Sequence, residues 1–140
     1  MTGLELLEGI RSGTVPPPGL AVTLGLTMEE IGAGRVVFGL EPGEEHLNPL
    51  GTVHGGVLSA LLDSAMGCAV HSTLPAGAGY TTLQLDVKFV RAVRAGDGAL
   101  RAEGVALHVG SRTATAEGRV VDAAGRLCAH GTSSLLGLRG

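Results

Sequence analysis

The sequence predicts an α+β domain in which a curved antiparallel sheet wraps one long, buried helix, with a short helix in front. Residues 55–70 (GGVLSALLDSAMGCAV) are apolar or small at nearly every position, a stretch too long for a strand and typical of a helix buried on all sides. The segments before and after it alternate between apolar and polar residues, the pattern of half-buried strands. A strongly curved sheet is the most economical cover for such a helix.

The first 19 residues are expected to form a short amphipathic helix and a proline-rich linker. Residues 2–11 (TGLELLEGIR) have the composition of an amphipathic helix, and the three prolines in 12–19 (SGTVPPPG) prevent that helix from continuing. We expect residues 20–140 to form the domain proper. A chain of 140 residues is long enough for one hydrophobic core and too short for two.

A β-hairpin is predicted next. Apolar residues alternate with small or polar ones over residues 20–28, and the pattern returns over 36–40 after a turn at 32–34 (GAG). The following segment, 41–53 (EPGEEHLNPLGTV), contains two prolines and two glycines and is expected to be a loop.

Four strands are predicted after the long helix. In residues 82–89 the pattern places one set of side chains on the apolar face (Leu83, Leu85, Val87 and Phe89) and the other on the polar face (Thr82, Gln84, Asp86 and Lys88). Three more strands are expected near 98–109, 112–122 and 126–136, because turn signals separate them at 110–111 and 122–125.

Charge and aromatic content argue against a nucleic-acid-binding protein. Residues 1–85 carry eight acidic and two basic side chains, and residues 86–140 carry five acidic and eight basic ones. This excess of bases is smaller than a nucleic-acid binder needs, and three aromatic residues offer little for bases to stack on. The basic half still leaves room for a local phosphate site.

A soluble, cytoplasmic protein is expected. Cys68 and Cys128 lie in apolar runs and suggest no disulfide framework. Glutamates occur in the first ten residues where a signal peptide would carry positive charge. Prolines and glycines interrupt the longest uncharged stretch, so neither export nor membrane association is predicted.

Asp63 is the one charged residue of the predicted long helix. An unpaired buried charge would cost several kcal/mol, so something must compensate it. Two interpretations stay open. In the first, one face of the helix is exposed to solvent, or a Ser or Thr side chain pairs with the carboxylate, and the role of Asp63 is structural. In the second, Asp63 is a general base.

The residues His54, Gly55 and Gly56 open that helix. Amides of a first helical turn have no partners within the helix, and together with the helix dipole they favour an oxygen that gains negative charge. Glycines also let a ligand approach the backbone closely. The alternative is that they only permit a tight junction, just as Asn48 and Pro49 only form a turn.

Gly55 and Asp63 are too far apart to serve one reaction centre within a single chain. Eight residues along a helix correspond to roughly 12 Å. Two antiparallel copies related by a two-fold axis could bring Asp63 of one chain near Gly55 of the other, which would give two composite sites per dimer.

The sequence suggests neither a metal nor a cofactor. Its five histidines have no short metal-ligand spacing with cysteines or acids. It contains no GxSxG nucleophile elbow, no GxxxxGK phosphate loop and no convincing dinucleotide-binding pattern.

Residues 46–69 (HLNPLGTVHGGVLSALLDSAMGCA) resemble the signature of hotdog-fold acyl-coenzyme A thioesterases of the phenylacetate-degradation type. The matching positions are Asn48-Pro49, Gly51, His54-Gly55-Gly56 and Asp63. Segments 81–93 and 108–118 resemble the family's next segments, so only the first 19 residues lie outside the resemblance. It implies a hotdog fold and a homo-oligomer, a dimer or tetramer with shared active sites, that hydrolyses arylacetyl- or medium-chain acyl-CoA. Coenzyme A would be part of the substrate, and no separate cofactor is implied.

The resemblance also implies roles for single residues. Asp63 would activate water or attack the thioester carbon itself, and the Gly55 amide would polarise the carbonyl, with Asn48 assisting there or holding the water. His54 would shape the loop and contact the thioester sulfur, Gly56 would contact the substrate, and Thr82 would orient the water.

The resemblance further indicates where coenzyme A would lie. The turn formed by Gly110, Ser111, Arg112 and Thr113 would approach the pantetheine and the nucleotide. The nearest cationic cluster comprises Lys88, Arg91 and Arg94. For each arginine, a solvated strand edge is the alternative to phosphate contact.

Two other functions are weighed against hydrolysis. A hotdog hydratase or dehydratase would need a histidine and an acid over the acyl chain, and the spacing from His54-Gly55-Gly56 to Asp63 argues against it. A non-catalytic acyl-CoA sensor would use the same pocket, which the presence of Asp63 disfavours.

Overall fold

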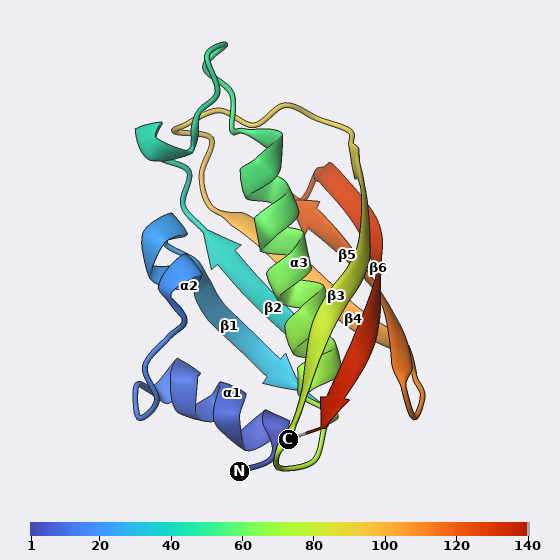
Figure 1. Cartoon of the computed structure of the whole chain (residues 1–140). Helices are drawn as coiled ribbons and strands as arrows, with labels where there is room; N and C mark the ends of the chain where they lie inside the picture. The colour runs from blue at the N-terminus through green and yellow to red at the C-terminus, as the bar shows by residue number, and fades with distance from the viewer. Residues whose placement is uncertain (140) are drawn as a thin grey trace.

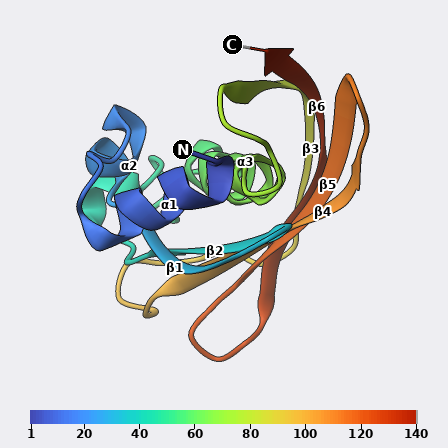
Figure 2. The same cartoon turned by 90° about the horizontal axis from the view of Figure 1, so that it is seen from below.

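Helix α3 (Gly55–His71) lies in the concave face of a six-stranded antiparallel sheet in the computed structural model, which describes residues 1–139 (Figure 1). The sheet order is β1-β2-β4-β5-β6-β3, so the strand that follows α3 forms one edge. Figure 2 shows the sheet curving around the helix, while α1 and α2 lie on the side that the sheet leaves open. The predicted α+β architecture is confirmed.

The strands that form the sheet are β1 (Thr27–Gly32), β2 (Arg35–Leu40), β3 (Ala78–Phe89), β4 (Leu100–Val109), β5 (Thr113–Val121) and β6 (Leu127–Arg139). The last three agree with the predicted strands to within a few residues, and the turn at 32–34 joins β1 to β2 as expected. No helix among residues 1–139 is long and apolar enough to cross a membrane.

The N-terminal segment contains two helices. Helix α1 (Gly3–Ser12) was predicted, and a capping box between Thr2 and Glu5 starts it. Helix α2 (Gly19–Leu24) was not, and the strand expected over 20–28 is wrong in its first part. Proline precedes α2, and Gly25, at a φ of 75°, ends it in the left-handed conformation. A helix of six residues is too short for the helical repeat of apolar residues to be recognised in the sequence.

A β-bulge divides strand β3. The pairing with β6 shifts its register between Thr82 and Gln84, so the predicted alternation fails there. Leu83, expected on the apolar face, is 58% exposed. Thr82, expected on the opposite face, points at α3 instead, and Leu85 beyond the bulge packs against the core as predicted.

Three glycines lie side by side across the sheet beneath α3. Gly104 of β4 pairs with Gly118 of β5, which pairs with Gly131 of β6. A Cβ on Gly104 would overlap the Ala65 carbonyl, and one on Gly118 would lie 3.0 Å from Cγ of Met66. Gly104 therefore lets the helix backbone rest directly on β4, and Gly118 leaves room for side chains of α3.

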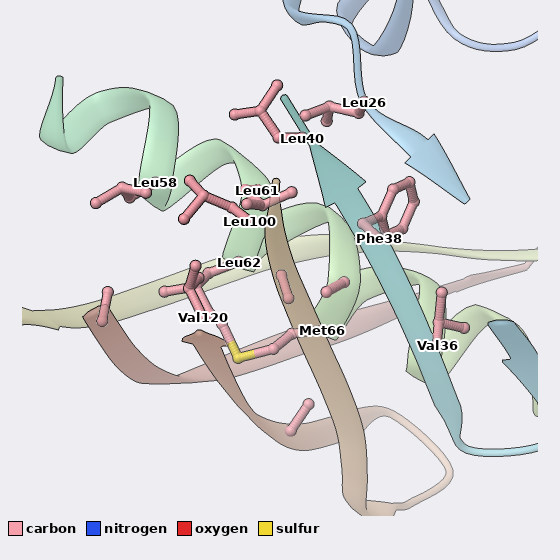
Figure 3. Packing of buried hydrophobic residues seen from close by; sticks show 14 of the residues in the cluster. Leu26, Val36, Phe38, Leu40, Leu58, Leu61, Leu62, Met66, Leu100 and Val120 are labelled. Carbon is pink, nitrogen blue, oxygen red and sulfur yellow. The ribbon is translucent and has the colours of Figure 1, made fainter. Parts of the chain in front are cut away.

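The core fills the space between α3 and the sheet on either side of this contact. Leu61, Leu62 and Met66 of α3 are fully buried and meet Leu100 and Val120 of the sheet (Figure 3). The opposite side of α3 is only partly covered within one chain, so the expectation of a helix buried all round is wrong for the single chain. The half-buried positions of α3 are Gly55, Val57, Ser59, Ala60, Asp63, Ser64, Cys68 and His71.

Candidate active site

Asp63 lies on the partly covered side of α3 and is held by the edge strand. The Thr82 hydroxyl donates a 2.8 Å hydrogen bond to its Oδ1 atom. No ion pair involves Asp63 within the part of the chain that the structure describes. The carboxylate is therefore half-buried, oriented by one hydroxyl, and left with acceptor positions for a water or a substrate.

The N-terminus of α3 presents a backbone amide with no acceptor. His54 caps the helix, because its Nδ1 atom accepts a 2.8 Å hydrogen bond from the Gly56 amide. This bond leaves the Nε2 atom of a neutral His54 as a donor. The Gly55 amide has no partner among residues 1–139, so it remains available to an oxygen atom.

A shallow cavity of about 360 Å³ adjoins this amide. Gly55, Phe89 and Arg91 are among its lining residues. A Cβ on Gly55 would lie 3.1 Å from the tip of the Phe89 ring, so the absence of a side chain lets that ring cover the start of the helix. Arg91 places a positive charge at the same opening.

Asn48 is occupied within its own turn. Its Oδ1 atom accepts hydrogen bonds from the amides of Leu50 and Thr52, at 3.0 and 3.1 Å, and its Nδ2 atom donates to Oγ1 of Thr52 at 2.9 Å. The other Nδ2 hydrogen has no acceptor among residues 1–139. In a single chain the side chain therefore shapes the loop ahead of α3, as the turn interpretation expected.

His46 anchors that loop and was not singled out by the sequence. It is 2% exposed, its Nδ1 atom accepts from the Gly43 amide at 2.9 Å, and its Nε2 atom lies 2.7 Å from the Leu24 carbonyl. Its own carbonyl accepts from the His54 amide at 2.8 Å. His46 thus fixes the start of α3 relative to α2, and no local pattern distinguishes it from a surface histidine.

The residues expected to meet coenzyme A fall into two groups at opposite ends of α3. Lys88 lies near the end of β3 and Arg91 just beyond it. This part of the chain reaches the N-terminus of α3, where Phe89 contacts Gly55. The turn 110–113 lies beside Val70 and Leu74 at the other end. One chain therefore brings together Asp63 with Thr82, and Gly55 with Arg91, but not the turn 110–113 with either cation.

The turn 110–113 and the cations near the N-terminus of α3 all present side chains to solvent. The turn is closed by a 2.8 Å bond from the Gly110 amide to the Thr113 carbonyl, and the Arg112 carbonyl accepts from Gly137. The side chains of Ser111, Arg112 and Thr113 are exposed, as are Lys88, Arg91 and Arg94.

Within residues 1–139 no three His, Cys, Asp or Glu side chains come together to hold a metal ion.

Uncharged groups line α3 beyond Asp63. Burial raises the pKa of Cys68 to about 12, and it raises the pKa of Tyr80 as well, with a smaller contribution from the Asp63 charge in both cases. Burial lowers the pKa of His71, which favours the neutral ring. The sequence did not single out Tyr80, since its position near Asp63 depends on how β3 packs against α3.

Comparison with known proteins places this geometry in context. A model of the thioesterase superfamily matches residues 50–129. A Halobacterium salinarum protein that carries a provisional esterase name is 34% identical, and the alignment covers 98% of this chain and 93% of that protein.

Two solved structures have the same architecture. One is a phenylacetic acid degradation-related protein of Ralstonia eutropha JMP134, provisionally named a thioesterase, with 30% identity, a TM-score of 0.85, and coverage of 94% of this chain and 98% of that one. The other is the Escherichia coli PaaI protein from the phenylacetic acid degradation operon, with 22% identity, a TM-score of 0.86, and coverage of 99% and 94%. At that identity the second likeness concerns the fold alone. The hotdog fold is confirmed.

Proposed function

The chain belongs to the thioesterase superfamily and is a thioester hydrolase, and from this premise we propose that it hydrolyses acyl-CoA to the free acid and coenzyme A. The observation that carries the proposal is the pair formed by Asp63 and Thr82, a half-buried carboxylate oriented by a hydroxyl 2.8 Å away. Such a carboxylate can act as a general base or as a nucleophile.

In the general-base form of the reaction, Asp63 accepts a proton from a water molecule. The water oxygen forms a bond to the thioester carbon, and the carbonyl oxygen gains the negative charge. The Gly55 amide, which has no acceptor among residues 1–139, donates a hydrogen bond to that oxygen. The carbon-sulfur bond then breaks, and the coenzyme A thiolate leaves and takes up a proton.

As a nucleophile, Asp63 would bond to the thioester carbon itself and expel the thiolate. The resulting anhydride would then be hydrolysed by water, which restores the carboxylate. Both routes need only a carboxylate, an amide and water, so the proposal includes no cofactor. Thr82 serves either route by orienting the carboxylate.

The proposed site is completed by a second copy of the chain. Gly55 and Asp63 are separated by roughly 12 Å along α3, too far for one carbonyl and its attacking water. The edge strand β3 pairs with β6 on one side only within residues 1–139. A long strand edge with an exposed Leu83 favours pairing with another chain, and a two-fold axis there would turn two α3 helices antiparallel.

The same arrangement would join the two groups expected to bind coenzyme A. Lys88 and Arg91 at one end of α3 would meet the turn 110–113 of the partner, so phosphates and pantetheine would be held by different chains. The dimer could pair further into a tetramer. We propose arylacetyl and medium-chain acyl groups as substrates, and the phenylacetic acid degradation name of the Ralstonia relative supports the first.

The decisive experiment measures thiol release from a panel of acyl-CoA esters by the wild type and by Asp63→Asn. Loss of the carboxylate should reduce kcat by at least about 100-fold with little change in binding. Glu117→Gln is the control, because Glu117 is an exposed carboxylate on β5, an interior strand away from the edge that the proposed dimer uses. Binding without turnover by the wild type would instead favour an acyl-CoA sensor.

A further inference from the structure

A cavity of about 610 Å³ lies between the N-terminal segment and α3. The two N-terminal helices lie on the side of α3 that the sheet leaves open (Figure 2). Most of its wall is aliphatic and comes from α1, α2 and the prolines between them, including Ile10, Val15 and Leu20. Its volume lies within the range of roughly 300 to 1,000 Å³ typical of small-molecule sites.

The N-terminal wall is fixed in place. The Gly3 amide donates a 3.0 Å hydrogen bond to the Leu74 carbonyl, and a Cβ on Gly3 would overlap the His71 carbonyl. Leu7 of α1 is 2% exposed and belongs to the main core. The cavity is therefore a formed space between packed elements.

The wall formed by α3 and β3 is different, because it is polar. Ser64, Cys68 and His71 face the cavity from successive turns of α3, and Tyr80 faces it from β3. The Tyr80 ring packs edge-on against the His71 ring, with the ring centroids 5.4 Å apart. Within residues 1–139, the side chains of Ser64 and His71 take part in no hydrogen bond, so these groups can serve a ligand.

This polar wall begins beside the proposed reaction centre. Tyr80 and Thr82 lie two residues apart on β3, before the bulge, and both point at α3. Thr82 contacts Asp63, whereas the Tyr80 hydroxyl would lie 2.6 Å from a Cβ on Gly67, four residues further along. Four residues correspond to about 6 Å of helix. An acyl chain whose thioester carbon lies at Asp63, and which extends along α3, thus reaches Tyr80 after several bonds.

We propose that the cavity receives the acyl group and that Tyr80, with Ser64, selects acyl chains that carry a hydroxyl group several carbons from the thioester. The proposal rests on the proposed function, because it places the thioester carbon at Asp63. A polar group in an apolar pocket fixes orientation, and an analogue without the hydroxyl leaves that group unpaired. The neutral state favoured for the half-buried His71 keeps a positive charge out of the pocket.

The test compares two thioesters of equal length, 6-hydroxyhexanoyl-CoA and heptanoyl-CoA, in which a hydroxyl replaces a methyl group. For the wild type, kcat/KM should be at least about tenfold higher for the hydroxylated ester. Tyr80→Phe removes one oxygen atom and should lower this ratio about tenfold, and Ser64→Ala should lower it less. Thr115→Val, which removes an exposed hydroxyl on β5, should leave the ratio unchanged.

A second readout separates this inference from the proposed function. The affinities of Asp63→Asn for the two esters, measured by calorimetry, should show the same preference without turnover. If the wild type hydrolyses no acyl-CoA ester, these two included, but the preference in binding persists, the proposed acyl-CoA hydrolysis is refuted and the assignment of the pocket stands. A wild type that does not prefer the hydroxylated ester in either readout, or a preference that survives both Tyr80→Phe and Ser64→Ala, would overturn the inference.

Discussion

Thr82 donates its hydroxyl hydrogen to Oδ1 of Asp63 over 2.8 Å, and this contact ties the one carboxylate of α3 to the edge strand of the sheet. The bulge between Thr82 and Gln84 makes the contact, because it turns Thr82 toward the helix while Leu83 turns to solvent. Backbone irregularity and side-chain orientation are therefore linked at the proposed reaction centre.

Thr82→Val should lower kcat about tenfold and leave KM nearly unchanged. Valine has the shape of threonine but cannot hold the carboxylate, so the loss should come from orientation of Asp63 and not from binding. Steady-state kinetics with one acyl-CoA ester measure both constants. Thr82→Ser restores a hydroxyl and should recover most of the activity. An unchanged kcat in Thr82→Val would show that the hydrogen bond has no role in turnover.

Gly55→Pro tests the backbone amide directly. Gly55 is the first residue of α3, where proline is well tolerated, and His54 before it has a φ of −58° and a ψ of 135°, which suits a residue preceding proline. Proline has no amide hydrogen. Loss of an oxyanion donor should reduce kcat by about 100-fold or more.

Gly55→Ala is the matched control for that variant. It adds the same Cβ near the Phe89 ring but keeps the amide hydrogen, so its activity should stay within about threefold of the wild type. Circular dichroism should show both variants folded. If the two variants lose activity equally, crowding of Phe89 explains the loss and the amide does not.

Local patterns predicted the parts of the fold that local chemistry determines. The uninterrupted apolar run gave α3, and turn residues marked the hairpins of the last three strands. The same reasoning failed over 20–28, where a short helix between Pro18 and Gly25 shows a spurious alternation. It also failed at Leu83, because a bulge depends on the pairing of β3 with β6 and leaves no mark in β3 alone.

The candidate site was predictable to the same degree. Asp63 and Gly55 stood out because a lone charge and a glycine pair are conspicuous in an apolar helix. Tyr80 and His46 were missed, since their importance arises from contacts with residues distant in the sequence. That Arg91 and the turn 110–113 lie at opposite ends of α3 could likewise be learned only from the structure.

Gly104→Ala should destabilise the protein by about 3 kcal/mol or more, because its Cβ would overlap the Ala65 carbonyl and the helix backbone cannot move without disturbing the core. Urea unfolding at fixed protein concentration measures the change. Gly79→Ala is the control, since a Cβ there meets nothing within 4 Å. Equal stabilities of the two variants would show that Gly104 does not determine how closely α3 packs on the sheet.

Complementation between inactive chains tests whether two copies share each site. Asp63→Ala lacks the carboxylate and Gly55→Pro lacks the amide, so each homodimer should be inactive. In a mixed dimer, one composite site carries both defects and the other carries neither. Random exchange of equal amounts should therefore restore about a quarter of wild-type activity per chain, given that half of the dimers are mixed and half of their sites intact.

Exchange itself must be measured in the same sample, with differently tagged chains and native mass spectrometry. Activity that rises in step with the mixed dimer would place Asp63 of one chain opposite Gly55 of the other. A sample in which mixed dimers form and no activity returns would refute the shared site, because the intact carboxylate and the intact amide would then belong to separate reaction centres. Such a result would require the roughly 12 Å between them to be bridged within one chain.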